Sequence, residues 1–133
     1  MEPHEYFNIA HFLANVKQEK ISKEIFYRTA INRLYYGVFH LVQIQLKIFI
    51  PQSEITRCHA YVKKSIENTN IIGDYSELEV YRVDSDYELS KKININHYKD
   101  ALRIQERILN KITEPERISY DDDEKFFFKH RKS

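Results

Sequence analysis

The chain has 133 residues, of which 42% are apolar and 31% charged, and its formal net charge is +1. This length fits one domain, and the near-neutral charge excludes a general attraction to nucleic acid, so any RNA contact needs a local basic patch. Only 2 Gly and 3 Pro occur, and this scarcity of turn-forming residues favours a few long helices over many short strands.

The first two predicted helices form the apolar centre of the chain. Apolar residues at helical spacing between Tyr6 and Val16 predict a first helix, which Pro3 could introduce and which is expected to end in the region of residues 17–20. A second helix is expected from Ser22, a candidate N-cap, to about Phe49. Its apolar residues form two adjoining stripes, Ala30, Leu34, Gly37, Leu41, Ile44 and Ile48, and Ile31, Tyr35, Val38, Val42 and Phe49. A helix that is apolar over so much of its circumference should be covered on several sides.

A polar stripe interrupts this apolar helix. Arg33 and His40 lie seven residues apart, so about two turns of helix bring them to one face. The same face collects Thr29, Tyr36, Gln43 and Lys47. Polar residues on a core helix need an explanation, and this stripe is the first candidate for a functional site.

Three further helices are expected beyond Pro51, which ends the second one. The third begins near Ser53 and Glu54 and extends to residue 66, and the fourth begins at Asp74, a candidate N-cap, and extends to residue 87. A fifth, from about Asn94 to residue 112, has one apolar and one charged side. We therefore predict an all-α fold, an up-and-down bundle of four main helices plus a shorter fifth element, over residues 1–113.

The C-terminal tail, residues 114–133, has a different composition. It contains an acidic run at 121–124, three consecutive Phe at 126–128 and a basic end at 129–132. The tail is either docked or mobile, and docking is favoured because three exposed Phe would promote aggregation.

Metal, disulfide and membrane signals are weak. Cys58 is the single cysteine, which excludes an internal disulfide, and Cys58 with His59 gives too few ligands for a metal. We therefore expect no metal and no cofactor. The start of the chain does not resemble a signal peptide, and no apolar run is long enough to span a membrane. The expected location is the cytoplasm.

Three motifs occur in an order that resembles one family. Residues 28–40 contain Arg33, a Tyr-Tyr pair, a small residue and Phe-His40; His59 precedes an apolar helix; and residues 81–87 read Tyr-Arg-Val-Asp-Ser-Asp-Tyr. This arrangement resembles the HEPN domain (higher eukaryotes and prokaryotes nucleotide-binding) over about residues 5–112. The resemblance implies a small helical bundle, usually a homodimer, and often the RNase toxin partnered by a nucleotidyltransferase-type antitoxin.

The resemblance also implies site residues. The family's catalytic signature is an Arg followed, after four to six residues, by a His, which Arg33 and His40 match in its loosest form. Metal-independent RNA cleavage would then use His40 as base or acid and Arg33 to bind the phosphate. Tyr36, one turn from each, could orient either group. A dimer that brings two such stripes face to face would form a composite site.

Other candidate residues surround this pair. Arg28 and His59 are secondary candidates for RNA binding. Arg82 and Asp86 are one turn apart, so a structural ion pair is expected, with Tyr87 anchoring the end of that helix.

Two alternatives stay open at this stage. Arg33 could instead pair with Asp86 across the bundle, and His40 could be a core or interface imidazole bonded to a backbone carbonyl. The second function class is a non-catalytic HEPN module that binds a nucleotide, RNA or protein. Leu34 favours it, because in many active members a polar residue directly follows the Arg.

Overall fold

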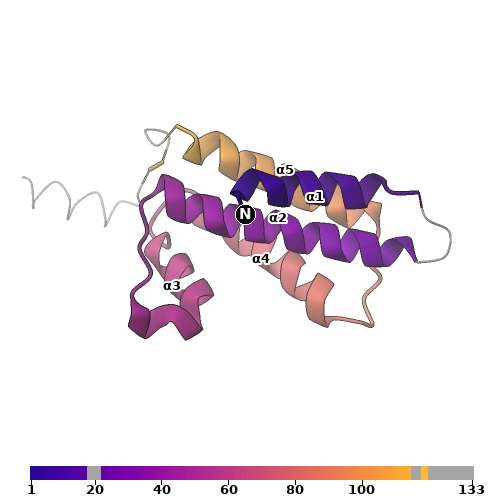
Figure 1. The fold of residues 1–133 in the computed structure, drawn as a ribbon, viewed down its shortest axis with the longest axis horizontal. Helices are drawn as coiled ribbons and strands as arrows, with labels where there is room; N and C mark the ends of the chain where they lie inside the picture. Colours follow the sequence, from indigo (N-terminus) through magenta and orange to yellow (C-terminus); the bar gives the residue numbers. More distant parts are fainter. Residues whose placement is uncertain (18–21, 115–117, 120–133) are drawn as a thin grey trace, which may run out of the picture.

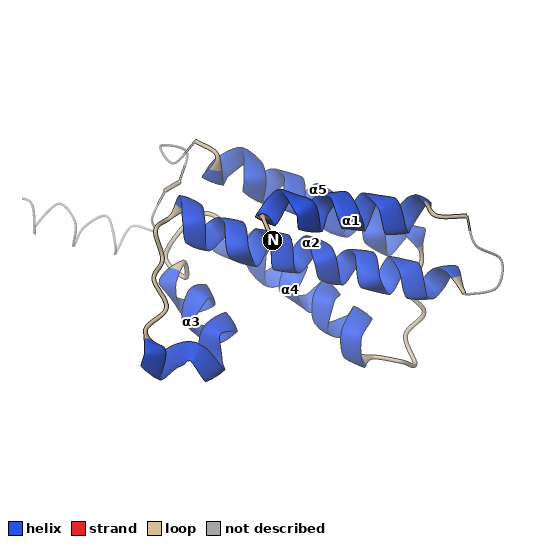
Figure 2. Ribbon diagram, in the orientation of Figure 1, coloured by secondary structure: helices blue, strands red, loops and turns tan. Residues whose placement is uncertain are grey.

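The protein is an all-α bundle, as predicted. The computed structural model describes residues 1–17, 22–114 and 118–119, and within them all regular structure is helical (Figures 1 and 2). The elements are α1 (Pro3–Asn15), α2 (Lys23–Gln45), the 3₁₀ helix η1 (Gln52–Arg57), α3 (Cys58–Ser65), α4 (Ile72–Tyr87) and α5 (Ile95–Ile112). No helix in these ranges is both long and apolar enough to cross a membrane.

Helix α2 is the central element of the bundle. It contacts α1, α4 and α5, and the short α3 packs near its C-terminal half (Figure 1). Both predicted apolar stripes are buried along the middle of the helix, at Ala30, Leu34, Gly37 and Leu41 and at Ile31, Tyr35, Val38 and Val42. The polar stripe, with Asn32 beside it, is therefore the side on which this middle portion of α2 offers polar groups.

The C-terminal end of α2 differs from the prediction. The helix ends at Gln45 instead of near Phe49, because Lys47 adopts a left-handed backbone conformation with φ 54°. The two predicted stripes are not buried over their full length, although Ile48 still packs against the core. Ile44 is 58% exposed and Phe49 is 84% exposed.

Two predicted helix starts are also corrected. The helix expected from Ser53 is divided into η1 and α3. Helix α4 begins at Ile72 with Ile71 as its N-cap, so Asp74 is not the cap. The Asp74 carboxylate instead forms an ion pair with Arg107 of α5 at 3.0 Å, which links α4 to α5. The local sequence could not predict this pairing.

Helix α5 follows the prediction closely. Asn94 is its N-cap and accepts hydrogen bonds from the backbone N–H groups of Asn96 and His97. The apolar side is buried at Tyr98, Ala101, Ile104, Ile108 and Ile112. The predicted docked or mobile state of the tail concerns residues that lie almost entirely outside the described ranges.

Helices α1 and α2 approach closely at one glycine. A Cβ built on Gly37 would lie 2.2 Å from Cε1 of Phe7, a buried residue of α1. Glycine is required here by this contact, since the backbone itself is ordinary helix. The contact fixes how α1 lies against the helix that carries the polar stripe.

Candidate functional site

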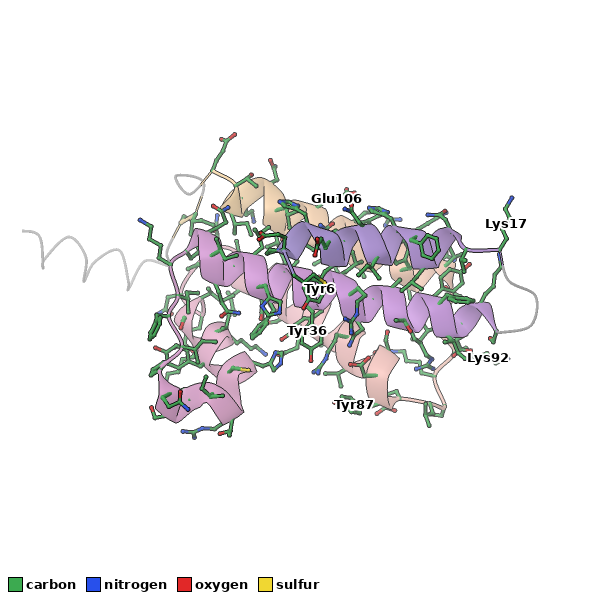
Figure 3. The ribbon with its side chains drawn as sticks, viewed as in Figure 1. Tyr6, Lys17, Tyr36, Tyr87, Lys92 and Glu106 are labelled. Atoms are coloured by element: carbon green, nitrogen blue, oxygen red, sulfur yellow. The ribbon has the colours of Figure 1, made fainter. Side chains whose placement is uncertain are left out.

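The polar stripe of α2 is half-buried. Arg33, Tyr36 and His40 are each of intermediate exposure. Figure 3 shows Tyr36 extending from α2 on the side where α3 and the end of α4 with Tyr87 are found. Residues from three helices can therefore meet on this face.

Tyr36 is the residue around which the others gather. The guanidinium carbons of Arg33 and Arg82 lie 5.8 and 5.6 Å from the centre of its ring. Arg82 also donates a hydrogen bond to the Tyr36 hydroxyl at 3.2 Å. The rings of His40 and His59 lie 6.5 and 5.4 Å away. We call Arg33, Tyr36, His40, His59 and Arg82 the Tyr36 cluster.

Arg33 has no acidic partner among the residues that the structure describes. Its guanidinium lies between the rings of Tyr6 and Tyr36, at 5.7 and 5.8 Å, and donates to Oδ1 of Asn32 at 2.6 Å. No ion pair in the described ranges includes Arg33. Buried or half-buried charges are usually paired, so this uncompensated charge favours binding of an anion.

The alternative pairing of Arg33 with Asp86 is not formed. Asp86 instead makes the expected ion pair with Arg82, at 3.1 Å, and accepts hydrogen bonds from Nδ2 of Asn32 at 3.0 and 3.2 Å. Asn32 thus links Arg33 to Asp86. Sequence reasoning missed Asn32, and the only signal was its position beside Arg33 and one turn before Tyr36.

His40 is set among aromatic rings. Its ring centre lies 5.3 Å from Tyr6 and 5.2 Å from Phe39. Partial burial, and then the positive charge of the chain's N-terminus, lower the pKa of His40. Within the described ranges no residue hydrogen-bonds to the imidazole, so the carbonyl-bonded arrangement is not seen there. A neutral imidazole with free nitrogens can accept a proton.

His59 joins the cluster from α3. Its Nδ1 lies 2.9 Å from the Tyr35 hydroxyl, and its ring stacks on Phe39 at 4.3 Å. Burial, and then the charge of Arg82, lower the pKa of His59. Two imidazoles that favour the neutral form therefore border the same tyrosine.

Arg28 lies apart from the cluster. It pairs with Glu24 at 2.8 Å, and its guanidinium donates to the backbone carbonyls that end α4 and lead into α5, those of Asp84, Ser85, Glu88 and Lys91. These contacts are those of a residue that caps a helix. Arg28 therefore positions α4, and with it Arg82 and Asp86.

Tyr87 and Cys58 are not members of the Tyr36 cluster. Tyr87 is 65% exposed, with the guanidinium carbon of Arg82 5.7 Å from its ring centre. Cys58 is a half-buried free thiol. In the part of the chain that the structure describes, no cluster of three or more His, Cys, Asp or Glu side chains is placed to hold a metal ion.

Comparisons of the chain with protein-family models, curated proteins and solved structures find no match. The chemistry of the Tyr36 cluster must therefore be argued from its own groups. Two guanidinium groups suit the binding of phosphate oxygens, and two imidazoles suit proton transfer or hydrogen bonding near neutral pH. A phosphodiester is the ligand class that would use both kinds of group.

Proposed function

We propose that the Tyr36 cluster is the site of a HEPN-type, metal-independent endoribonuclease. The observation that supports this proposal is the half-buried guanidinium of Arg33, which forms no ion pair with a described residue and lies beside Tyr36, with the His40 imidazole near the same ring. An anion bound at Arg33 would compensate its charge, and His40 would then lie near the reacting atoms.

The proposed reaction divides the work between these two residues. Neutral His40 takes the proton of a ribose 2′-hydroxyl, whose oxygen attacks the adjacent phosphorus. The bond to the 5′-oxygen breaks, a protonated histidine returns a proton to that oxygen, and a 2′,3′-cyclic phosphate remains. Arg33 stabilises the negative charge that builds on the phosphate oxygens. Tyr36, in contact with both Arg33 and His40, orients the two groups.

A homodimer is part of the proposal. Val80, Val83 and Tyr87 on one side of α4 are 58%, 39% and 65% exposed, and this side adjoins the one that carries Arg82 and Asp86. Exposed apolar side chains in such a row are typical of an interface. In the proposed dimer a second copy docks on this face, and the second His40 supplies the acid. The toxin role, with a nucleotidyltransferase-type antitoxin, rests on the motif resemblance alone.

The second candidate function is RNA or nucleotide binding without cleavage. Leu34 is fully buried in the core, so position 34 contributes no polar group beside Arg33. The Asp86 carboxylate also pairs with Arg82 and reduces the positive charge available to a phosphate. The same cluster would then hold a ligand without completing proton transfer.

The deciding experiment compares purified wild-type protein with the variants Arg33→Ala and His40→Ala. End-labelled RNA is incubated with each protein in the presence of a chelator, and the products are resolved on a gel. We expect the wild type to cleave and each variant to lose at least about a hundredfold in rate, as for removal of a catalytic acid–base or charge-stabilising group. Induced expression should be toxic only for proteins that cleave.

Matched controls separate chemistry from folding. Arg103→Ala and His11→Ala remove an Arg from α5 and a His from α1, away from the cluster, and should cleave like the wild type. Intact RNA with the folded wild type would refute the endoribonuclease. Intact RNA together with binding that needs Arg33 would establish the non-catalytic module instead.

A further inference from the structure

A chain of buried hydroxyl groups leads to His59 from inside the bundle. The Tyr75 hydroxyl of α4 lies 3.4 Å from the Tyr35 hydroxyl of α2, which lies 2.9 Å from Nδ1 of His59. Both tyrosines are fully buried, at 0% exposure, and His59 is half-buried. Burying two polar groups in an apolar core costs free energy unless they hydrogen-bond to each other or to a neighbour.

The direction of these hydrogen bonds follows from counting donors. Each tyrosine has one O–H to donate. If Tyr75 donates to Tyr35 and Tyr35 donates to Nδ1 of His59, both buried protons are used. In the reverse direction the Tyr75 proton has no acceptor, since within the described ranges Tyr35 is its one hydrogen-bond partner. An unmet buried donor is the more expensive arrangement.

Both tyrosines keep these protons at any pH the protein meets. Burial raises the pKa of Tyr35 to about 12 and raises that of Tyr75 further. They therefore act as donors throughout this range, and Nδ1 of neutral His59 is the acceptor at the end of the chain. In a neutral imidazole whose Nδ1 accepts, the proton resides on Nε2.

We infer that the buried Tyr75–Tyr35 pair fixes His59 as a neutral imidazole that presents its Nε2–H to the ligand at the Tyr36 cluster, where it binds a phosphate oxygen. Nδ1 faces the fully buried Tyr35, whereas His59 as a whole is only half-buried, so we expect the edge opposite Nδ1, which bears Nε2, to be the part of the ring that a ligand reaches. This role deepens the proposed endoribonuclease and rests on it for the identity of the ligand.

The charged neighbours of His59 agree with a neutral donor. Arg82 of α4 and His40 of α2 disfavour the imidazolium, while Glu79 of α4 favours it. Glu79 is itself paired with Lys63 of α3 at 2.7 Å. Protonating His59 would also set an N–H at Nδ1 against the Tyr35 O–H and force both hydroxyls to reverse. His59 and His40 thus have different tasks, the first donating a hydrogen bond and the second moving a proton.

The first test reads the tautomer directly and needs no RNA. Long-range ¹H–¹⁵N correlation spectra of the ¹⁵N-labelled protein, with His59 assigned by the loss of its signals in His59→Gln, distinguish the Nε2–H from the Nδ1–H form. We expect one Nε2–H tautomer at neutral pH in the wild type and a mixture of both in Tyr35→Phe. An Nδ1–H tautomer, or a mixture in the wild type, would overturn the inference. Should Tyr35→Phe unfold, the wild-type spectrum still decides.

The second test measures binding of an RNA oligonucleotide made uncleavable by 2′-O-methyl groups. By fluorescence anisotropy, His59→Ala should bind roughly tenfold more weakly than the wild type, as for the loss of one hydrogen bond to a charged group. His59→Gln, which retains an N–H donor, should lose less. Equal affinities of His59→Ala and the wild type would refute the contact with phosphate. A wild type that binds no RNA refutes the proposed function and the assignment of the ligand together, while the spectra decide the tautomer independently.

Discussion

Arg33 is surrounded by aromatic rings and an amide, with no carboxylate from the described residues pairing with it. Cation–π contacts stabilise a guanidinium without neutralising it, so the charge stays available to a ligand. Arg82 is different, because Asp86 pairs with it directly. At the scale of single residues, the two arginines of the cluster therefore have different capacities to bind an anion.

The two histidines of the cluster lead to a prediction about how the free energy of unfolding depends on pH. The pKa values of His40 and His59 are both lowered in the folded protein, first by burial and then by positive charges, the N-terminus for His40 and Arg82 for His59. In the unfolded chain they return to about 6.5. Between that value and the lower folded values, the unfolded chain binds more protons. The free energy of unfolding should therefore fall as the pH is lowered through this window.

Urea denaturation at about pH 7.5, 6.5 and 5.5 measures this dependence. The double variant His40→Gln, His59→Gln should show a shallower decline over the same range. Glu24, whose pKa is lowered mainly by its hydrogen bond with Arg28, acts at more acidic pH and does not interfere. Equal slopes for the wild type and the double variant would contradict the prediction.

At the scale of the helices, the close contact between α1 and α2 at Gly37 leads to a prediction about stability. Alanine at position 37 would place its Cβ 2.2 Å from the ring of Phe7, which is buried, so the ring or α1 itself must shift. We expect Gly37→Ala to lower the free energy of unfolding by about 1–3 kcal/mol, the usual cost of overpacking. Urea denaturation again supplies the measurement.

Gly73 provides the matched control for this substitution. It lies in the first turn of α4, and a Cβ there would meet nothing within 4 Å. Gly73→Ala should raise stability by roughly 0.4–1 kcal/mol, because alanine loses less conformational entropy on folding into a helix. If the two variants changed stability alike, the close approach of α1 would not be the reason for glycine at position 37.

Helical spacing was enough to predict the bundle and the face of α2 that carries Arg33, Tyr36 and His40. The ends of the helices were less predictable. The end of α2 depends on the left-handed backbone conformation of Lys47, and Asp74, expected as an N-cap, instead pairs with the distant Arg107. The composition of the Tyr36 cluster depends on how the helices pack. His59 hydrogen-bonds to Tyr35, 24 residues away in the sequence, and Asn32 to Asp86, 54 residues away. No periodicity in the sequence encodes such pairings.

For the molecule as a whole, the proposed dimer gives a prediction about mass. Light scattering of the wild type at micromolar concentration should give twice the mass of one chain. Val80→Asp should give a single chain, because a carboxylate in the centre of an apolar interface would be desolvated without a partner. Phe12→Asp, at an exposed apolar position on α1, should stay dimeric. A monomeric wild type would refute the composite site. A dimeric Val80→Asp would show that the dimer interface does not include this face of α4.

The central position of α2 affects how the protein is made in the cell. The ribosome synthesises α2 before α4 and α5, which cover much of it. Until then the nascent chain exposes side chains that end fully buried, such as Ile31, Leu34 and Val38. Transiently exposed apolar surface of this kind is prone to aggregation and is bound by chaperones. The yield of folded protein should therefore depend on what covers α2 before α4 and α5 emerge from the ribosome.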